Sequence, residues 1–290
     1  MWVDSFPGMV LCLALAGSGA APHWQTRGHA RAEGPLERVV VLGASVSGGH
    51  GLAVDLARAL DAIVAAPHEP VRGFADHLFF LAPRPRGREQ LERVRAARPT
   101  LVVAVDFLFW YGYGFAASEE ERLERLEAGL AELERFECPL VVGGFPDVSA
   151  AAGKILLPAQ VPAPETIAAL ERRVRAWSAE RPGVVLLPLD ELVGRIQSGA
   201  GFTIGDRPWP AEPGLRLLQW DDLHPTLEGL TGLACKIGEL LRERFADVRP
   251  SDLRLDPVVL LALLQGQTDE ARAARRLERA ERRALSHSGR

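Results

Sequence analysis

The sequence contains few cysteines, and their spacing indicates neither a metal site nor a redox-active cysteine pair. Among its 290 residues only Cys12, Cys138 and Cys235 are cysteines, with no Cys-x-x-Cys pair and no metal-ligand spacing. A structural zinc site and a dithiol redox motif are therefore not indicated. We expect Cys138 and Cys235 to be buried thiols, and a single disulfide between them is the alternative.

The chain also lacks an excess of positive charge. Its formal net charge is −4, and among its 34 basic residues only Lys154 and Lys236 are lysines. This balance gives no indication of nucleic acid or of an anionic membrane surface as a partner. Hydrophobic residues at 47% and charged residues at 25% are ordinary for a soluble globular protein with a sizeable core.

No apolar run near the N-terminus is long enough to cross a bilayer as a helix, so no integral membrane span is expected. Residues 9–17 are apolar, and residues 18–20 are small and precede a possible cleavage point at Ala21. We therefore predict a signal peptide over residues 1–20 and export to the periplasm or the medium. Asp4, with no Lys or Arg beside it, favours the alternative of a misassigned start or a buried segment in a cytoplasmic protein.

Short apolar runs without polar alternation are typical of strands that are buried on both faces. The predicted strands are residues 38–43, 62–66, 100–105, 139–143 and 184–188. Helical patterns lie between them at residues 50–60, 88–97, 119–136 and 165–180, and a last helix follows Pro225 and runs to about Phe245. Alternating strands and helices indicate a parallel sheet with right-handed crossovers. We therefore expect an α/β fold, a three-layer αβα domain over residues 36–248 with a five-stranded parallel flavodoxin-like sheet.

The last part of the chain has a different composition. Residues 258–264 are apolar and could pack on the domain, whereas residues 270–283 are dense in Arg, Glu and Ala. The interpretation is a charged C-terminal helical tail over residues 249–290, solvated or frayed at its end.

Chemically suited residues fall at one edge of the predicted sheet. Ser45 follows the first strand, Asp106 ends the third, and Asp221 and His224 come after the fifth. Because the carboxyl ends of parallel strands form the site in such sheets, we expect these side chains to lie together. An Asp three residues before a His can orient the imidazole, which in turn activates a serine hydroxyl. We predict Ser45 as the nucleophile, His224 as general base and acid, and Asp221 as the residue that orients His224.

Each of these residues also has a purely structural interpretation. Ser45 or Ser47 could cap the helix that follows, and Asp221 or Asp222 could cap the helix that begins near Pro225. Asp222 as the cap, with Asp221 held by His224, would satisfy both interpretations.

A dinucleotide-binding loop is a further alternative, because Gly43-Ala44-Ser45 follows an apolar strand and three more glycines come after it. The spacing differs from the fingerprint, since Ser47 stands where the second glycine belongs and no acidic residue clearly ends the second strand. The Tyr-x-x-x-Lys pair of short-chain dehydrogenases is also absent, because Phe115 and Ala117 stand four residues after the two tyrosines. An NAD(P)-dependent dehydrogenase is therefore the less favoured interpretation.

The order and spacing of these motifs resemble the SGNH, or GDSL-like, hydrolase family over residues 38–246. Gly43-Ala44-Ser45 matches the family's Gly-Asp-Ser block, and Asp221 to His224 matches its Asp-x-x-His block. The resemblance implies hydrolysis of esters or acyl groups through a covalent acyl-serine, with no metal and no cofactor. The implied substrate is a small-molecule ester, such as an acetylated sugar or a short acyl lipid.

The sequence departs from the family pattern at two points. Ala44 replaces the family's Asp, and the end of the third strand carries Asp106 where the family has Gly-x-Asn-Asp, so the side-chain donor to the oxyanion is missing. The resemblance leaves Asp106 as the oxyanion or binding residue, Gly73 as the family's lone glycine, and the Ser45 and Gly73 amides as oxyanion donors. Loss of one such donor costs about 100- to 1000-fold in rate, which favours a binding protein without turnover as the rival interpretation.

Three further features have two interpretations each. The aromatic segment 107–114 could wall an acyl or sugar pocket, or it could be ordinary core and lid packing. Residues 145–147, Phe-Pro-Asp, could contact substrate or could be a turn. His50, between two glycines, is interpreted as structural or solvent-facing rather than as a metal ligand, because no second ligand stands at a fixed spacing.

Overall fold

The computed structural model describes residues 34–288, with side chains placed over residues 34–273. Its centre is a five-stranded parallel sheet in the order β2-β1-β3-β4-β5. The strands are β1 (Val39–Val41), β2 (Arg72–Gly73), β3 (Leu101–Ala104), β4 (Leu140–Gly143) and β5 (Val184–Leu187). This order is that of a flavodoxin-like sheet, so the predicted fold class is confirmed. The predicted signal peptide and Cys12 lie outside the described residues.

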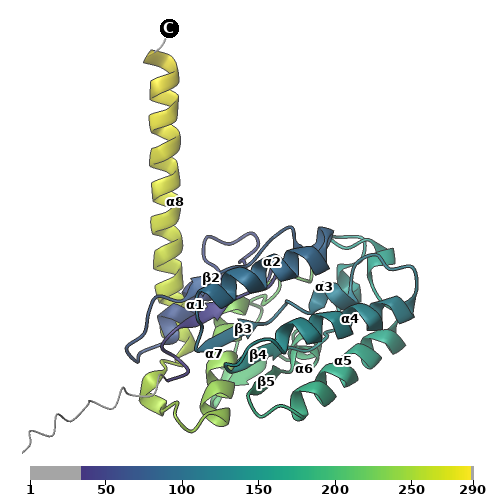
Figure 1. Ribbon diagram of the computed structural model, residues 1–290. Coiled ribbons are helices and arrows are strands. Elements are labelled where there is room, and N and C mark those ends of the chain that lie inside the picture. The colour runs from purple at the N-terminus through teal and green to yellow at the C-terminus, as the bar shows by residue number, and fades with distance from the viewer. Residues whose placement is uncertain (1–33, 289–290) are drawn as a thin grey trace, which may run out of the picture. The chain divides into compact units, whose positions relative to one another are not determined.

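Helices cover both faces of the sheet and form the outer layers (Figure 1). One face carries α1 (Leu56–Ile63), α7 (Leu227–Arg244) and the first turns of α8 (Pro257–Ser288). The other face carries α2 (Pro83–Ala96), α4 (Glu119–Leu133) and α5 (Pro164–Ala179). Alternate strand residues serve the two layers, since Val39 and Val41 join the first core and Val40 joins the second. The sheet is therefore buried on both sides, as its run of branched residues requires.

The second strand was predicted in the wrong place. Residues 62–66 are not a strand, because α1 runs to Ile63 and Val64 makes only an isolated bridge with Leu253. The apolar residues there are the buried end of a helix whose N-terminus is capped by Asp55, which accepts a hydrogen bond from the Arg58 amide at 2.9 Å. A short apolar run fits a strand and a buried helix end equally well, so periodicity alone could not separate them.

Three elements after β5 were not predicted. Helix α6 (Leu189–Gln197) is followed by an antiparallel hairpin of β6 (Phe202–Ile204) and β7 (Arg207–Trp209). Leu192 and Phe202 from these elements are buried in the core.

The C-terminal residues form one continuous helix, α8. Its side chains at Leu260 and Leu264 are buried in the core shared with α1 and α7. The packed body therefore extends beyond residue 248. Across residues 34–288, no helix is long and apolar enough to cross a membrane.

Cys138 and Cys235 are free thiols, so the alternative of a disulfide between them is wrong. Burial raises the thiol pKa of Cys138 to about 11 and that of Cys235 to about 12. Both therefore stay protonated and unreactive near neutral pH.

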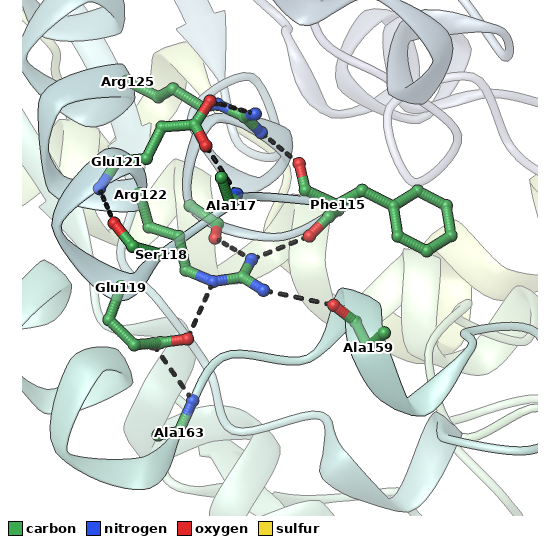
Figure 2. A network of polar contacts seen from close by, with 11 residues as sticks. Phe115, Ala117, Ser118, Glu119, Glu121, Arg122, Arg125, Ala159 and Ala163 are labelled. Atoms are coloured by element: carbon green, nitrogen blue, oxygen red, sulfur yellow. Dashed lines mark hydrogen bonds and ion pairs between the residues drawn. The ribbon is translucent and has the colours of Figure 1, made fainter.

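The short helix α3 (Phe109–Gly112), which follows β3, is held by a buried arginine of α4 (Figure 2). The Arg122 guanidinium donates hydrogen bonds to the carbonyl oxygens of Gly112 at 2.9 Å, Gly114 at 2.8 Å and Ala159 at 3.2 Å. Glu119 pairs with it at 3.3 Å. One side chain thus joins the ends of two loops that leave the carboxyl edge of the sheet.

We expect replacement of Arg122 by Leu to lower the free energy of unfolding by about 2–4 kcal/mol, because buried carbonyl oxygens lose their donor. Urea denaturation measures this change. The matched control is Arg125→Leu, one turn along on the more exposed face of α4, with an expected change of about 1 kcal/mol or less. Equal effects of the two substitutions would contradict the assigned role of Arg122.

Candidate active site

Ser45 lies in a tight loop directly after β1, and a carboxylate holds that loop. Asp106, just past β3, accepts hydrogen bonds from the amides of Ala44 at 3.0 Å and Val46 at 2.8 Å. It also accepts from the Ser47 hydroxyl at 2.6 Å and more weakly from the Ser47 amide at 3.3 Å. The loop backbone therefore wraps around one side chain from the neighbouring strand.

This arrangement requires a glycine at the start of the loop. Gly43 has a φ of +147°, and a Cβ there would stand 2.1 Å from the Asp106 carboxylate. A larger residue would push the carboxylate away from the amides that it holds.

The amide of Ser45 differs from those of its neighbours. Among the described residues no acceptor is found for it, whereas the amides of Ala44, Val46 and Ser47 are all bound to Asp106. An N–H that is free beside the hydroxyl is able to donate to an oxyanion that forms there.

The structure brings Ser45, His224 and Asp221 together into one chain of hydrogen bonds. The Ser45 hydroxyl lies 2.8 Å from His224 Nε2, and His224 Nδ1 lies 2.7 Å from Asp221 Oδ2. His224 and Asp221 are 2% and 1% exposed, so the bond between them is shielded from water, whereas Ser45 is only half-buried. With Nδ1–H donating to Asp221, Nε2 is left to accept the serine proton.

Asp221 is prepared to stay ionised. Burial alone would raise the pKa of its carboxyl, but hydrogen bonds from the His224 amide, the His224 ring and the Leu223 amide outweigh burial and lower it. A carboxylate in this state stabilises an imidazolium at His224 when the proton moves.

The capping interpretations of these residues are wrong. Thr226 caps α7, accepting from the Gly229 amide at 3.1 Å, and Asp55 caps α1. Asp222 instead pairs with Lys154 and Arg216. Asp221 is thereby left free of any capping role.

His50 lies directly against the candidate base. Its ring stacks on that of His224, with centroids 4.1 Å apart and an interplanar angle of 23°. Burial and the nearby His224 lower the pKa of His50, which favours its neutral form. The possible ligand atoms of His50, Asp221 and His224 lie within 4.8 Å of one another, so this trio is the group of described residues that could hold a metal ion. His224 is already hydrogen-bonded through one ring nitrogen to Asp221 and through the other to Ser45, which favours a serine nucleophile over a metal site.

The structure places Gly73 and Asp106 differently from their expected roles. Gly73 is the exposed last residue of β2, and a Cβ there would approach Asp55 and Ala57 at the start of α1. It does not line the pocket at Ser45. Asp106 does line that pocket, but it acts as an acceptor for the loop amides and not as a donor. The sequence contains no asparagine at all, so no other segment supplies the family's amide donor.

An apolar pocket opens beside Ser45. Its cavity volume is about 90 Å³, several times the roughly 10–15 Å³ that holds one water molecule. Phe109 and Trp110 line it, whereas Phe107, Tyr111 and Tyr113 are buried in the core. Part of the aromatic segment therefore forms a wall of the pocket, and the rest is packed in the core.

Other walls of the pocket come from the Phe-Pro-Asp segment, for which contact with substrate is one of the two interpretations, and from α6, which the sequence analysis does not predict. Pro146, from the Phe-Pro-Asp turn, lines the pocket, and its carbonyl accepts from the Tyr113 hydroxyl at 2.7 Å. Helix α6 contributes apolar side chains spaced three, four and seven residues from Leu189. This spacing places the apolar side chains on one face of a helix, so the sequence could have predicted an amphipathic helix after the fifth strand.

The loop after β1 does not fit a dinucleotide. The pyrophosphate in that fold rests on a helix N-terminus that opens directly after the glycine loop. Here α1 begins only at Leu56, and its N-terminus carries the carboxylate of Asp55.

Comparisons with known proteins give structural neighbours only. No family model matches the sequence, and no curated protein matches it either. Among solved structures, TesA is similar with a TM-score of 0.46 and 17% identity, over 72% of this chain and 100% of that chain. A lipase/acylhydrolase from Enterococcus faecalis has a TM-score of 0.42 and 16% identity, over 76% of this chain and 98% of that one.

A catalytic mutant of Axe2, an acetylxylan esterase from Geobacillus stearothermophilus, has a TM-score of 0.46 and 17% identity, over 75% of this chain and 98% of that chain. A GDSL-like lipase from Bacteroides thetaiotaomicron is also among these neighbours. At this level of similarity, the chemistry of the chain has to be argued from its own site.

We expect Asp106→Asn to lower the free energy of unfolding by about 1–3 kcal/mol, because an amide NH₂ would face N–H donors that now have an acceptor. Urea denaturation tests this. Asp147→Asn is the control, since the Asp147 carboxylate accepts only from the Ser149 amide in an exposed turn, and the expected change is about 0.5 kcal/mol or less. An unchanged stability of Asp106→Asn would show that the loop does not depend on the carboxylate.

The lowered pKa of Asp221 sets a pH dependence of stability. A carboxyl with a folded-state pKa below its unfolded value of about 3.9 stabilises the fold above that pH, and this contribution is lost as pH falls through the folded-state value. Asp221→Asn should therefore lose less stability than the parent protein between about pH 4 and pH 2. Urea unfolding across this range measures the slope, with Asp222→Asn as the neighbouring control. Parallel curves for parent and Asp221→Asn would refute the assignment.

Proposed function

We propose that this chain is a serine hydrolase that cleaves carboxylic esters through an acyl-serine intermediate. The observation that carries the proposal is a chain of two hydrogen bonds. One joins Ser45 Oγ to His224 Nε2 at 2.8 Å, and the other joins His224 Nδ1 to Asp221 Oδ2 at 2.7 Å. All three are presented at the carboxyl edge of the sheet, and an apolar pocket opens beside the hydroxyl. Nucleophile, base and orienting carboxylate therefore stand in hydrogen-bond reach of one another.

In the proposed reaction, Ser45 Oγ attacks the ester carbonyl while His224 Nε2 takes the hydroxyl proton. Asp221 stabilises the resulting imidazolium through its bond to Nδ1. His224 then returns the proton to the leaving alcohol, and the acyl group remains on Ser45. A water molecule then attacks the acyl-serine while His224 takes its proton, and His224 returns that proton to Ser45 Oγ as the bond to the acyl group breaks and the acid leaves.

The negative charge on the tetrahedral oxygen is met by the amide N–H of Ser45. Because the chain has no asparagine, the proposed site operates with fewer donors than the family pattern supplies. One missing donor costs about 100- to 1000-fold in rate, so we expect slow turnover. The same observation favours the second candidate, a binding protein on this fold that has lost turnover.

A fluorophosphonate probe separates these two functions. We expect the protein to be labelled covalently at Ser45, because the probe needs the activated hydroxyl but not a complete oxyanion site. Ser45→Ala should abolish labelling, as seen by in-gel fluorescence and by the mass of the intact protein. Ser47→Ala is the control, since that hydroxyl is bound to Asp106 and labelling should persist. A folded parent protein that takes up no probe would favour the binding protein.

A further inference from the structure

We propose that the pocket beside Ser45 holds an aliphatic acyl chain, so that the substrates are esters of acids with several methylene groups rather than acetate esters. This inference rests on the proposed ester hydrolysis and names its substrate class. It replaces the broader expectation of a small ester, which includes acetylated sugars.

The lining of the pocket excludes polar acyl groups. Of its nineteen lining residues only Ser45 and Asp106 carry a hydroxyl or a charge. Both oxygens of Asp106 are already engaged by the amides and hydroxyl of the nucleophile loop. A sugar hydroxyl placed here would lose its water without gaining a partner, which is costly. A methylene chain has no such need.

The pocket is shaped as a continuation of the reacting centre. Ser45 and Trp110 line it, as do Val193 and Ile196 from α6. Its lining reaches Phe202 of the hairpin and Leu233 of α7, both part of the buried core. An acyl carbon bound to Ser45 Oγ can therefore direct its chain into the space between α6 and α7. Acetate would leave most of that space without contacts.

The surroundings of the site are also apolar. Within residues 34–273 eleven large hydrophobic side chains are exposed, and three of them lie on α8. The other eight all lie in connections that leave the carboxyl ends of strands: Leu78, Phe80, Leu81, Phe115, Ile155, Leu157, Leu215 and Trp220. The Phe80 ring lies 5.5 Å from that of Trp110, which lines the pocket. Apolar surface thus continues from the exposed loops to the pocket, as suits an aliphatic substrate.

The test is the dependence of kcat/KM on acyl length, measured with p-nitrophenyl esters from acetate to dodecanoate. Each methylene that leaves water contributes about fourfold, so we expect a rise of roughly 250-fold over the four methylenes that separate acetate from hexanoate. Val193→Trp fills the pocket and should lower the hexanoate-to-acetate ratio by at least about tenfold. Gly194→Trp is the matched control on the same helix, because a Cβ at Gly194 meets no atom within 4 Å. Its ratio should equal that of the parent protein.

A second measurement does not depend on turnover or on the folding of Val193→Trp. Ser45→Ala protein is titrated with cis-parinaric acid, a fluorescent fatty acid, and the probe is displaced with octanoate or with acetate. Displacement by octanoate at concentrations at least about 100-fold below those of acetate supports the acyl pocket.

The outcomes separate the two proposals. Hydrolysis with a flat length profile, together with no fatty-acid binding, overturns the acyl pocket and leaves ester hydrolysis standing. Fatty-acid binding to Ser45→Ala without any ester turnover by the parent protein supports the pocket and overturns the hydrolase.

Discussion

The position of the candidate nucleophile depends on one carboxylate. Asp106 extends from the end of β3 into the loop after β1 and accepts from the Ala44 and Val46 amides. Because β1 and β3 are neighbours in the sheet, this side chain ties the loop to the end of the central strand. Gly43 makes the close approach possible. Ser45 is thereby presented by a loop that is fixed to a second strand, and not by the first turn of a helix.

The same carboxylate limits what the site can do for a developing charge. Where GDSL-like hydrolases are expected to carry an amide that donates, this chain carries a group that here only accepts. The oxygens of Asp106 accept hydrogen bonds from the loop that carries Ser45. The Ser45 amide is then the group that can donate a hydrogen bond to an oxyanion. One side chain at the end of β3 can therefore either hold the loop that carries the nucleophile or donate a hydrogen bond to an oxyanion. The proposed function implies that this chain favours positioning.

The sequence predicted those parts of the molecule that follow from strong local patterns. The runs around β1, β3, β4 and β5 are rich in valine, a β-branched residue that favours strands, and their alternation with helices implies the parallel order. The spacing of Asp221 and His224 predicted their contact, because three residues suffice for one carboxylate to reach both the amide and the ring.

What the sequence could not supply depends on tertiary contacts. Strand β2 has two exposed residues and no apolar pattern that would predict a strand. The apolar end of α1 fits the strand pattern better, and the prediction of a second strand therefore falls there. The stacking of His50 on His224 joins residues far apart in the chain, and no periodicity encodes it. The acceptor role of Asp106 also depends on the path of the opposite loop. Glycine 73 was assigned by family order alone, and its place beside α1 follows from the true position of β2.

The brevity of β2 has a consequence for the behaviour of the protein in concentrated solution. A parallel sheet rich in valine would offer a foreign strand a long row of unpaired N–H and C=O groups if its outer strand were long. Here the outermost strand on that side ends after Arg72 and Gly73, and the first of these carries a charge. At this edge the sheet therefore presents almost no template for pairing with a foreign strand, which lowers the tendency of the β2 side to aggregate.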